Sequence, residues 1–151
     1  MLVSQYLKEK FCILELGSDT KEGAVREIAD KLESTNKITN KEKFIDDVLE
    51  REHLGSTGIG NSIGIPHART DSVKGFVMGF GRSSKGIEFK ALDGVRVKLI
   101  FLMGADPGEL NLYLRILAEL SKLLMDQSFR DALLSASSEA EIIKILKKFD
   151  K

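Results

Sequence analysis

The stretch from 51 to 71 reads REHLGSTGIGNSIGIPHARTD, and the rest of the chain is organised around it. It contains both histidines, four of the thirteen glycines and one of the two prolines. Residues 54–65 carry no charge. So many glycines disfavour a helix interior, and the polar residues among them disfavour a plain core strand. The stretch therefore predicts a shaped loop that presents a reactive side chain.

His67 is the candidate reactive group. Pro66 has a fixed φ and no N–H, and it biases Ile65 toward an extended conformation. Residues 63–65 are therefore predicted to form a short strand that stops at the histidine, with the imidazole facing outward. The fixed backbone would hold the ring in place.

An anion site is predicted beside this histidine. Glycine lets the backbone pass close to a ligand, and successive N–H groups can line an anion-sized hollow. Arg51 adds a permanent charge and a planar fork of donors that suits phosphate. The predicted phosphate-binding groups are the hydroxyls of Ser56 and Thr57 and the amides of Gly58, Gly60 and Gly64.

Phosphoryl transfer is the chemistry that suits these groups. Neutral imidazole is nucleophilic, and histidine forms covalent intermediates. Transfer of a phosphoryl group mainly needs an in-line nucleophile and compensation for the charge on the moving oxygens. The chain contains no G-x-x-x-x-G-K-[ST] nucleotide motif. The predicted phosphoryl donor is therefore another protein.

The order R-E-x-L-x-S-T-G-I-G-N-x-I-x-I-P-H resembles the active-site segment of enzyme IIA domains from the bacterial phosphotransferase system, in its fructose, mannitol and nitrogen-regulatory branch. The resemblance continues through VKLIFL at 97–102, YLRILAELSKLL at 113–124, FRDALL at 129–134 and EIIKIL at 141–146. It implies one domain over 1–151, of the α/β class, with a mixed β-sheet flanked by helices on both faces. It also implies that His67 is the phosphorylated residue and Arg51 its charge partner.

The resemblance implies a transferase component that works through phosphohistidine. His67 would accept a phosphoryl group from HPr or an HPr-like protein and pass it to a cysteine of enzyme IIB for sugar uptake. No cofactor or metal is expected, and an apolar rim of Ile59, Ile63 and Ile65 is predicted to dock the partner proteins. The alternative is a nitrogen-regulatory protein whose phosphorylation state controls its binding to other targets.

Two further residues leave alternatives open. Many similar proteins have a second histidine where this chain has Tyr113, so Tyr113 either donates a hydrogen bond at the site or belongs to the core stripe of its helix. Glu52 either orients Arg51 or His67 or simply ends a helix.

A metal site formed by His53, His67 and Asp71 is another alternative. Their spacing matches no known metal-binding motif, and His53 is expected to be exposed and without a role in the site.

Composition excludes several other functions. The 151 residues are 42% hydrophobic and 30% charged, as in globular proteins. Basic and acidic residues balance at 23 each, so no electrostatic footprint for nucleic acid or an anionic membrane is present. There is no secretory signal pattern, and no apolar run approaches the length of roughly 20 residues that a membrane-spanning helix needs.

Cys12 is the single cysteine and lies in an apolar run. This position predicts a buried, inert thiol, and a lone cysteine fits a reducing cytoplasm.

Patterning predicts the elements as follows. Capping residues and apolar spacing predict a helix through 24–34 and another after Asn40, with Arg51 in its last turn. The remaining predicted elements are strands at 11–14, 73–81 and 95–103, a loop at 82–86, a short edge piece at 87–89, a break at 106–108, and helices at 109–125, 129–134 and 138–149.

Overall fold

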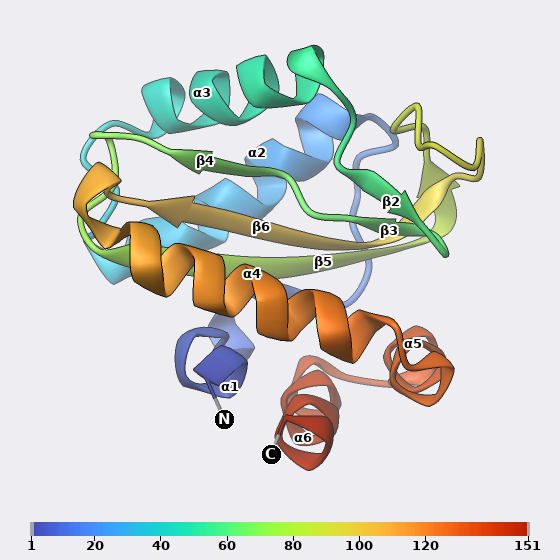
Figure 1. Cartoon of the computed structure of the whole chain (residues 1–151). Helices are drawn as coiled ribbons and strands as arrows, with labels where there is room; N and C mark the ends of the chain where they lie inside the picture. Colours follow the sequence, from blue (N-terminus) through green and yellow to red (C-terminus); the bar gives the residue numbers. More distant parts are fainter. Residues whose placement is uncertain (1, 151) are drawn as a thin grey trace.

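A six-stranded mixed sheet lies between two groups of helices in the computed structural model, which describes residues 2–150 (Figure 1). The strands are, in order across the sheet, β1 (Cys12–Ile13), β5 (Phe76–Ile87), β6 (Val97–Ala105), β3 (Ile63–Gly64) and β2 (Gly58–Gly60), with β4 (His67–Arg69) also paired to β6. The long central strands β5 and β6 are antiparallel, whereas β1 is parallel to β5, and β3 and β4 are parallel to β6. The predicted α/β architecture with a mixed sheet is confirmed.

Helices cover both faces of the sheet, as predicted (Figure 1). The α-helices are α1 (Leu2–Tyr6), α2 (Lys21–Leu32), α3 (Lys41–Leu54), α4 (Leu110–Leu124), α5 (Gln127–Ser135) and α6 (Glu139–Phe149). Short 3-10 turns are η1 (Glu9–Phe11), η2 (Glu33–Thr35) and η3 (Pro107–Glu109). No helix among residues 2–150 is long and apolar enough to cross a membrane.

Two glycines bring α2 and α3 close to one face of the sheet. A Cβ on Gly79 would lie 2.5 Å from Ile28 of α2, and a Cβ on Gly104 would lie 2.5 Å from Phe44 of α3. Side chains alternate across a strand, so the neighbours of these glycines face the other helices. Phe76 accordingly packs its ring against Tyr6 of α1.

The predicted helix starts are confirmed by their caps. The side chains of Thr20 and Asn40 accept hydrogen bonds from the backbone N–H three residues later, at 3.0 Å in both helices. Such a bond satisfies one of the otherwise unpaired amides at a helix start. Arg51 lies in the last turn of α3, as predicted.

The prediction of a loop at 82–86 was wrong, because strand β5 continues through these residues to Ile87. Arg82 pairs with Leu99 in the sheet, and its guanidinium donates to the carbonyls of Leu133, Leu134 and Ala136 at the end of α5. Polar residues usually signal a loop, but here a charged side chain caps a helix. The short helix α1 was also not predicted from the sequence.

The backbone around the histidine also differs from the prediction. Residues 58–64 form a hairpin, whose turn residues Asn61 and Ser62 have φ of 56° and 64°. Positive φ at both central residues is typical of tight hairpin turns, and asparagine tolerates it well. The extended segment does not stop at His67, because a second short strand, β4, begins there.

Candidate active site

His67 is the first residue of β4, directly after Pro66. It is paired with Met103 of β6, and the imidazole is half-buried. Its Nδ1 lies 2.7 Å from the carbonyl oxygen of Ile65. A carbonyl oxygen only accepts hydrogen bonds, so Nδ1 carries the ring proton and donates it. The lone pair of the neutral ring is therefore on Nε2.

The surroundings of His67 keep its ring neutral. Burial lowers the pKa of His67, and the neighbouring positive charge of Arg51 also lowers it. The hydrogen bond to Ile65 and the negative charge of Glu52 oppose this shift without reversing it. The ring of His67 is thus neutral at pH values where an unperturbed histidine begins to protonate.

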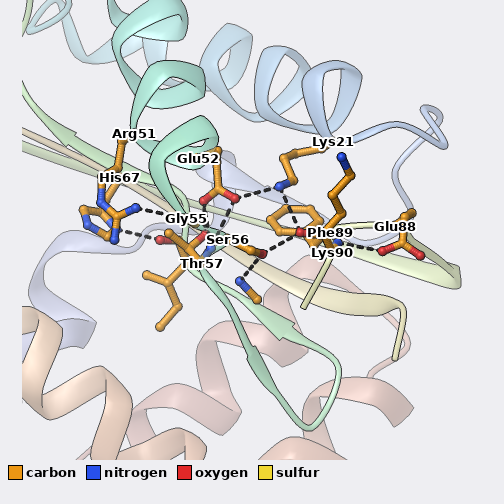
Figure 2. A network of polar contacts seen from close by, with 12 residues as sticks. Lys21, Arg51, Glu52, Gly55, Ser56, Thr57, His67, Glu88, Phe89 and Lys90 are labelled. Carbon is orange, nitrogen blue, oxygen red and sulfur yellow. Dashed lines mark hydrogen bonds and ion pairs between the residues drawn. The ribbon is translucent and has the colours of Figure 1, made fainter. Parts of the chain in front are cut away.

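Arg51 lies beside His67, as the sequence predicted. The end of α3 carries it, and its Nη1 donates to the carbonyl oxygen of Gly55 at 2.8 Å. Figure 2 shows the guanidinium and the imidazole next to each other. Held in this way by the loop after its own helix, Arg51 supplies a positive charge close to the imidazole.

The hydroxyls predicted to bind phosphate have other partners in this structure (Figure 2). Thr57 is buried and donates to the carboxylate of Glu52 through both its amide and its hydroxyl. Ser56 donates to the carbonyl oxygen of Phe89, and its oxygen accepts from the amide of Gly58. These groups build the loop beside the histidine.

Glu52 and Tyr113 approach the site in different ways. The Glu52 carboxylate is buried and bonds Thr57 and Lys21 rather than Arg51 or His67. Tyr113 of α4 is buried with the core stripe of its helix, yet its ring contacts the imidazole, with centroids 5.6 Å apart. Burial raises the pKa of Tyr113, and the cations Arg51 and Arg69 oppose that shift. The position of Tyr113 is consistent with both predicted roles, as a core residue and as a residue of the site.

A cleft of about 760 Å³ opens onto His67 between α3, β4 and the start of α4. Its charged lining residues are Lys43, Asp47, Glu50, Arg51, Arg69 and Asp71. Lys43 is paired with Asp47 and Asp71, at 2.9 and 3.0 Å. The Arg69 guanidinium, in contrast, makes no hydrogen bond or ion pair within residues 2–150.

The rim of this cleft is apolar, but not where the sequence predicted. Ile63 and Ile65 are buried in the core and cannot meet a partner, whereas Ile59 is exposed. The exposed apolar residues on the cleft are Leu54, Leu110 and Leu114. The leucines at 110 and 114 lie one helical turn apart, outside the buried stripe of α4, and that spacing was the signal available in the sequence.

The other reactive side chains do not converge on the cleft. Among residues 2–150, no three histidine, cysteine or acidic side chains are placed to hold a metal ion, so His53, His67 and Asp71 do not form a site. Cys12 is buried, and burial together with the nearby Glu139 and Glu9 raises its pKa to about 12. Its thiol is therefore protonated and unreactive.

Comparison with known protein families decides what kind of protein this is. Residues 5–149 match the family described as the phosphoenolpyruvate-dependent sugar phosphotransferase system, EIIA 2. The chain belongs to this family. The resemblance stated from the active-site segment is thus confirmed.

The relatives fall into sugar-specific and regulatory groups. The chain is 37% identical over 151 residues to the fructose-specific EIIABC component of Bacillus subtilis, and it spans 24% of that protein. It is also 37% identical over 133 residues to the fructose-specific EIIA component of Haloferax volcanii, and it spans 86% of that protein. It is 33% identical over 126 residues, 83% of this chain and 80% of the relative, to a nitrogen regulatory protein of Bradyrhizobium diazoefficiens.

Solved structures share the whole fold. Nitrogen regulatory protein IIA-Ntr of Neisseria meningitidis superposes with a TM-score of 0.89 at 29% identity, covering 97% of this chain and 99% of that one. IIA mannitol of Escherichia coli has the same fold, with a TM-score of 0.78 at 24% identity over 92% of this chain and 97% of that one. The α/β architecture is therefore that of EIIA proteins.

Proposed function

We propose that this chain is a phosphocarrier in which Nε2 of His67 receives a phosphoryl group from the phosphohistidine of HPr or an HPr-like protein. The Nε2 lone pair forms the new P–N bond while the P–N bond of the donor breaks, and the donor nitrogen leaves with the electron pair. One observation carries this proposal: the Nδ1–H bond to Ile65 leaves the Nε2 lone pair available. In the second step, a cysteine thiolate of enzyme IIB takes the phosphoryl group.

Charge compensation is the second requirement, and Arg51 meets it. Phosphorylation replaces a neutral ring with a group that carries close to two negative charges. Arg51 lies beside the ring with its guanidinium held by Gly55. Ser56, Thr57 and Gly58 contribute by fixing the loop that holds both residues, and an anion at Nε2 can also draw on amides of this glycine-rich segment. The chemistry requires no metal or nucleotide on this chain.

The partners should dock over the apolar rim of Leu54, Leu110 and Leu114, because the phosphoryl donor and acceptor must both reach His67 through the cleft. One protein with this fold, enzyme IIAMTL of Escherichia coli, forms a complex with phosphorylated enzyme IIBMTL. That complex supports enzyme IIB as the acceptor. Residues 1–151 would act as a single EIIA module on the cytoplasmic side of the membrane.

We favour fructose-type sugar transport, because two fructose-specific relatives are each 37% identical to this chain. The alternative is a regulatory protein of the nitrogen branch, which the 33% identical relative and the Neisseria structure support. Transfer from phosphorylated protein to a purified fructose enzyme IIB would support transport. Phosphorylation-dependent binding to a different target, without such transfer, would support regulation.

The proposal is tested by incubating the protein with phosphoenolpyruvate, enzyme I and HPr. We expect one acid-labile phosphoryl group, detected by intact mass, on the wild type and on a His53→Gln control, and none on His67→Gln. His53 is exposed on α3 and does not line the cleft, so it is a matched histidine. A folded wild-type protein that takes up no phosphate from a cognate donor would refute the carrier function.

A further inference from the structure

A partly buried ion pair lies behind the active-site loop, and neither of its residues lines the cleft. Lys21, the first residue of α2, has its Nζ 2.8 Å from Oε1 of Glu52 on α3. The Glu52 side chain is only 3% exposed. The same Nζ donates to the carbonyl oxygen of Phe89 at 3.0 Å and lies 4.6 Å from the centre of that ring. Figure 2 shows these contacts, and sequence reasoning missed Lys21 because it lies 31 residues from its partner.

A series of hydrogen bonds, linked through the backbones of Thr57 and Ile65, connects this ion pair to the imidazole of His67. The Glu52 carboxylate accepts from the amide and hydroxyl of Thr57. The carbonyl of Thr57 accepts from the amide of Ile65 at 3.1 Å. The carbonyl of Ile65 then accepts from Nδ1 of His67 at 2.7 Å. Two peptide segments thus join a buried carboxylate to the ring that is to be phosphorylated.

We propose that Lys21 and Glu52 are positioning residues that select the reactive tautomer of His67. The inference rests on the proposed function, since only a ring with its proton on Nδ1 offers the Nε2 lone pair to phosphorus. The Ile65 carbonyl imposes this tautomer, and Thr57, clamped by Glu52, fixes where that carbonyl points.

Stability alone does not account for this ion pair. A buried ion pair has a large desolvation cost, and replacing it with apolar side chains is often neutral or stabilising. The exposed pair of Arg26 and Glu42, 2.7 Å apart, also joins α2 and α3, yet it does not reach the loop. The pair of Lys21 and Glu52 differs from the exposed pair in its connection to Thr57, which is the difference that bears on function.

The test compares Glu52→Met, which removes the acceptor for Thr57, with the double variant Lys21→Met/Glu52→Met, which leaves no unpaired charge behind the loop if the single variant folds poorly. The matched control is Arg26→Gln/Glu42→Gln, which removes the exposed pair between the same helices. The first readout is ¹⁵N NMR of the His67 ring above its pKa, which distinguishes the two tautomers. The second is the rate of phosphoryl transfer from phospho-HPr, separated into kcat and KM.

We expect both Glu52 variants to populate the Nε2–H tautomer and to lose kcat roughly ten-fold or more, with the KM for phospho-HPr little changed. The control should keep the Nδ1–H tautomer and the wild-type kcat. A folded Glu52 variant with the wild-type tautomer and kcat would overturn the inference. The NMR readout needs no phosphodonor, so it reports on the network even if His67 of the wild type accepts no phosphate.

Discussion

The imidazole of His67 lies against the phenol ring of Tyr113, with centroids 5.6 Å apart and ring planes inclined by 54°. The Tyr113 hydroxyl has no hydrogen-bond partner among residues 2–150, and the residue lines the same cleft as Arg51 and Arg69. We therefore expect it to donate to a phosphoryl oxygen on Nε2. This contact would give tyrosine a role at the position where many similar proteins have a second histidine.

Tyr113→Phe keeps the ring contact and removes only the hydroxyl. A hydrogen bond to a charged group contributes about 1.5 kcal/mol or more, so we expect kcat for phosphoryl transfer to fall about ten-fold. Stability should change little. Tyr6→Phe, at a tyrosine that packs on Phe76 far along the chain from the site, is the control. Equal transfer rates for Tyr113→Phe and wild type would leave Tyr113 as a core residue only.

Local signals were sufficient to predict the parts of the site that are close in sequence. Pro66 identified the fixed backbone before His67, and Asn40 marked the start of the helix that ends near Arg51. The contacts of Glu52 and Tyr113 were left open, because each depends on packing between elements far apart in the chain. Tyr113 reaches His67 only after α4 folds back across the sheet.

The prediction failed where a tertiary partner overrides local composition. Arg82 lies in a polar run that is typical of a loop. It nevertheless belongs to β5, because its guanidinium donates hydrogen bonds to three backbone carbonyls at the end of α5. The contact of the Thr57 hydroxyl was not predicted either, because this hydroxyl donates to the buried carboxylate of Glu52 on the preceding helix. Neither partner is visible from the residues next to these side chains.

The lowered pKa of His67 predicts a specific dependence of stability on pH. Because the folded-state pKa is below the unfolded value of 6.5, stability is complete above that pH and declines as the pH falls through the folded-state pKa. His67→Gln lacks this linkage. Below 6.5 we expect the free energy of unfolding of wild type to fall relative to that of the variant, as measured by urea denaturation. A difference that stays constant with pH would contradict the lowered pKa.

Arg51 should affect His67 in two separable ways. Its charge lowers the pKa of the imidazole, so Arg51→Gln should raise that pKa in an NMR titration. The same variant should slow phosphoryl transfer on the order of a hundred-fold, because the charge on the moving oxygens is no longer balanced.

Arg51→Lys separates these two effects. It keeps the positive charge, so the pKa of His67 should stay close to wild type, but it lacks the planar fork that reaches both Gly55 and a phosphoryl group. We expect only partial recovery of the transfer rate. Arg115→Gln, at an exposed arginine of α4 outside the cleft, should leave both quantities unchanged. Full recovery of the rate in Arg51→Lys would show that charge alone is required.

Arg69 should stabilise the phosphorylated form. It lies two residues after His67 on β4, so both side chains leave the same face of the strand, and both line the cleft. No acidic residue among 2–150 pairs with it. We expect Arg69→Gln to lower the equilibrium constant for transfer from phospho-HPr, by roughly ten-fold for the loss of one charged hydrogen bond.

Equilibrium is the right readout for Arg69, because contacts made only in the transient complex change how fast the phosphoryl group equilibrates, not where it settles. Arg115→Gln again serves as the control, since it removes an exposed arginine outside the cleft. An unchanged equilibrium constant with a slower approach to it would assign Arg69 to docking instead.

The leucines around the cleft should act on partner binding and not on chemistry. Leu54 is 81% exposed, and Leu114 lies across the cleft from it on α4. The buried centre of a protein interface is more apolar than its rim, so exposed leucines beside the histidine suit a contact with a partner. We expect Leu54→Ser and Leu114→Ser each to raise the KM for phospho-HPr by about ten-fold, with kcat at saturation unchanged. Leu92 is 92% exposed but outside the cleft, so Leu92→Ser should leave KM as in wild type. If the KM values of Leu54→Ser and Leu114→Ser match that of Leu92→Ser, the phosphoryl donor does not dock over the leucines of this cleft.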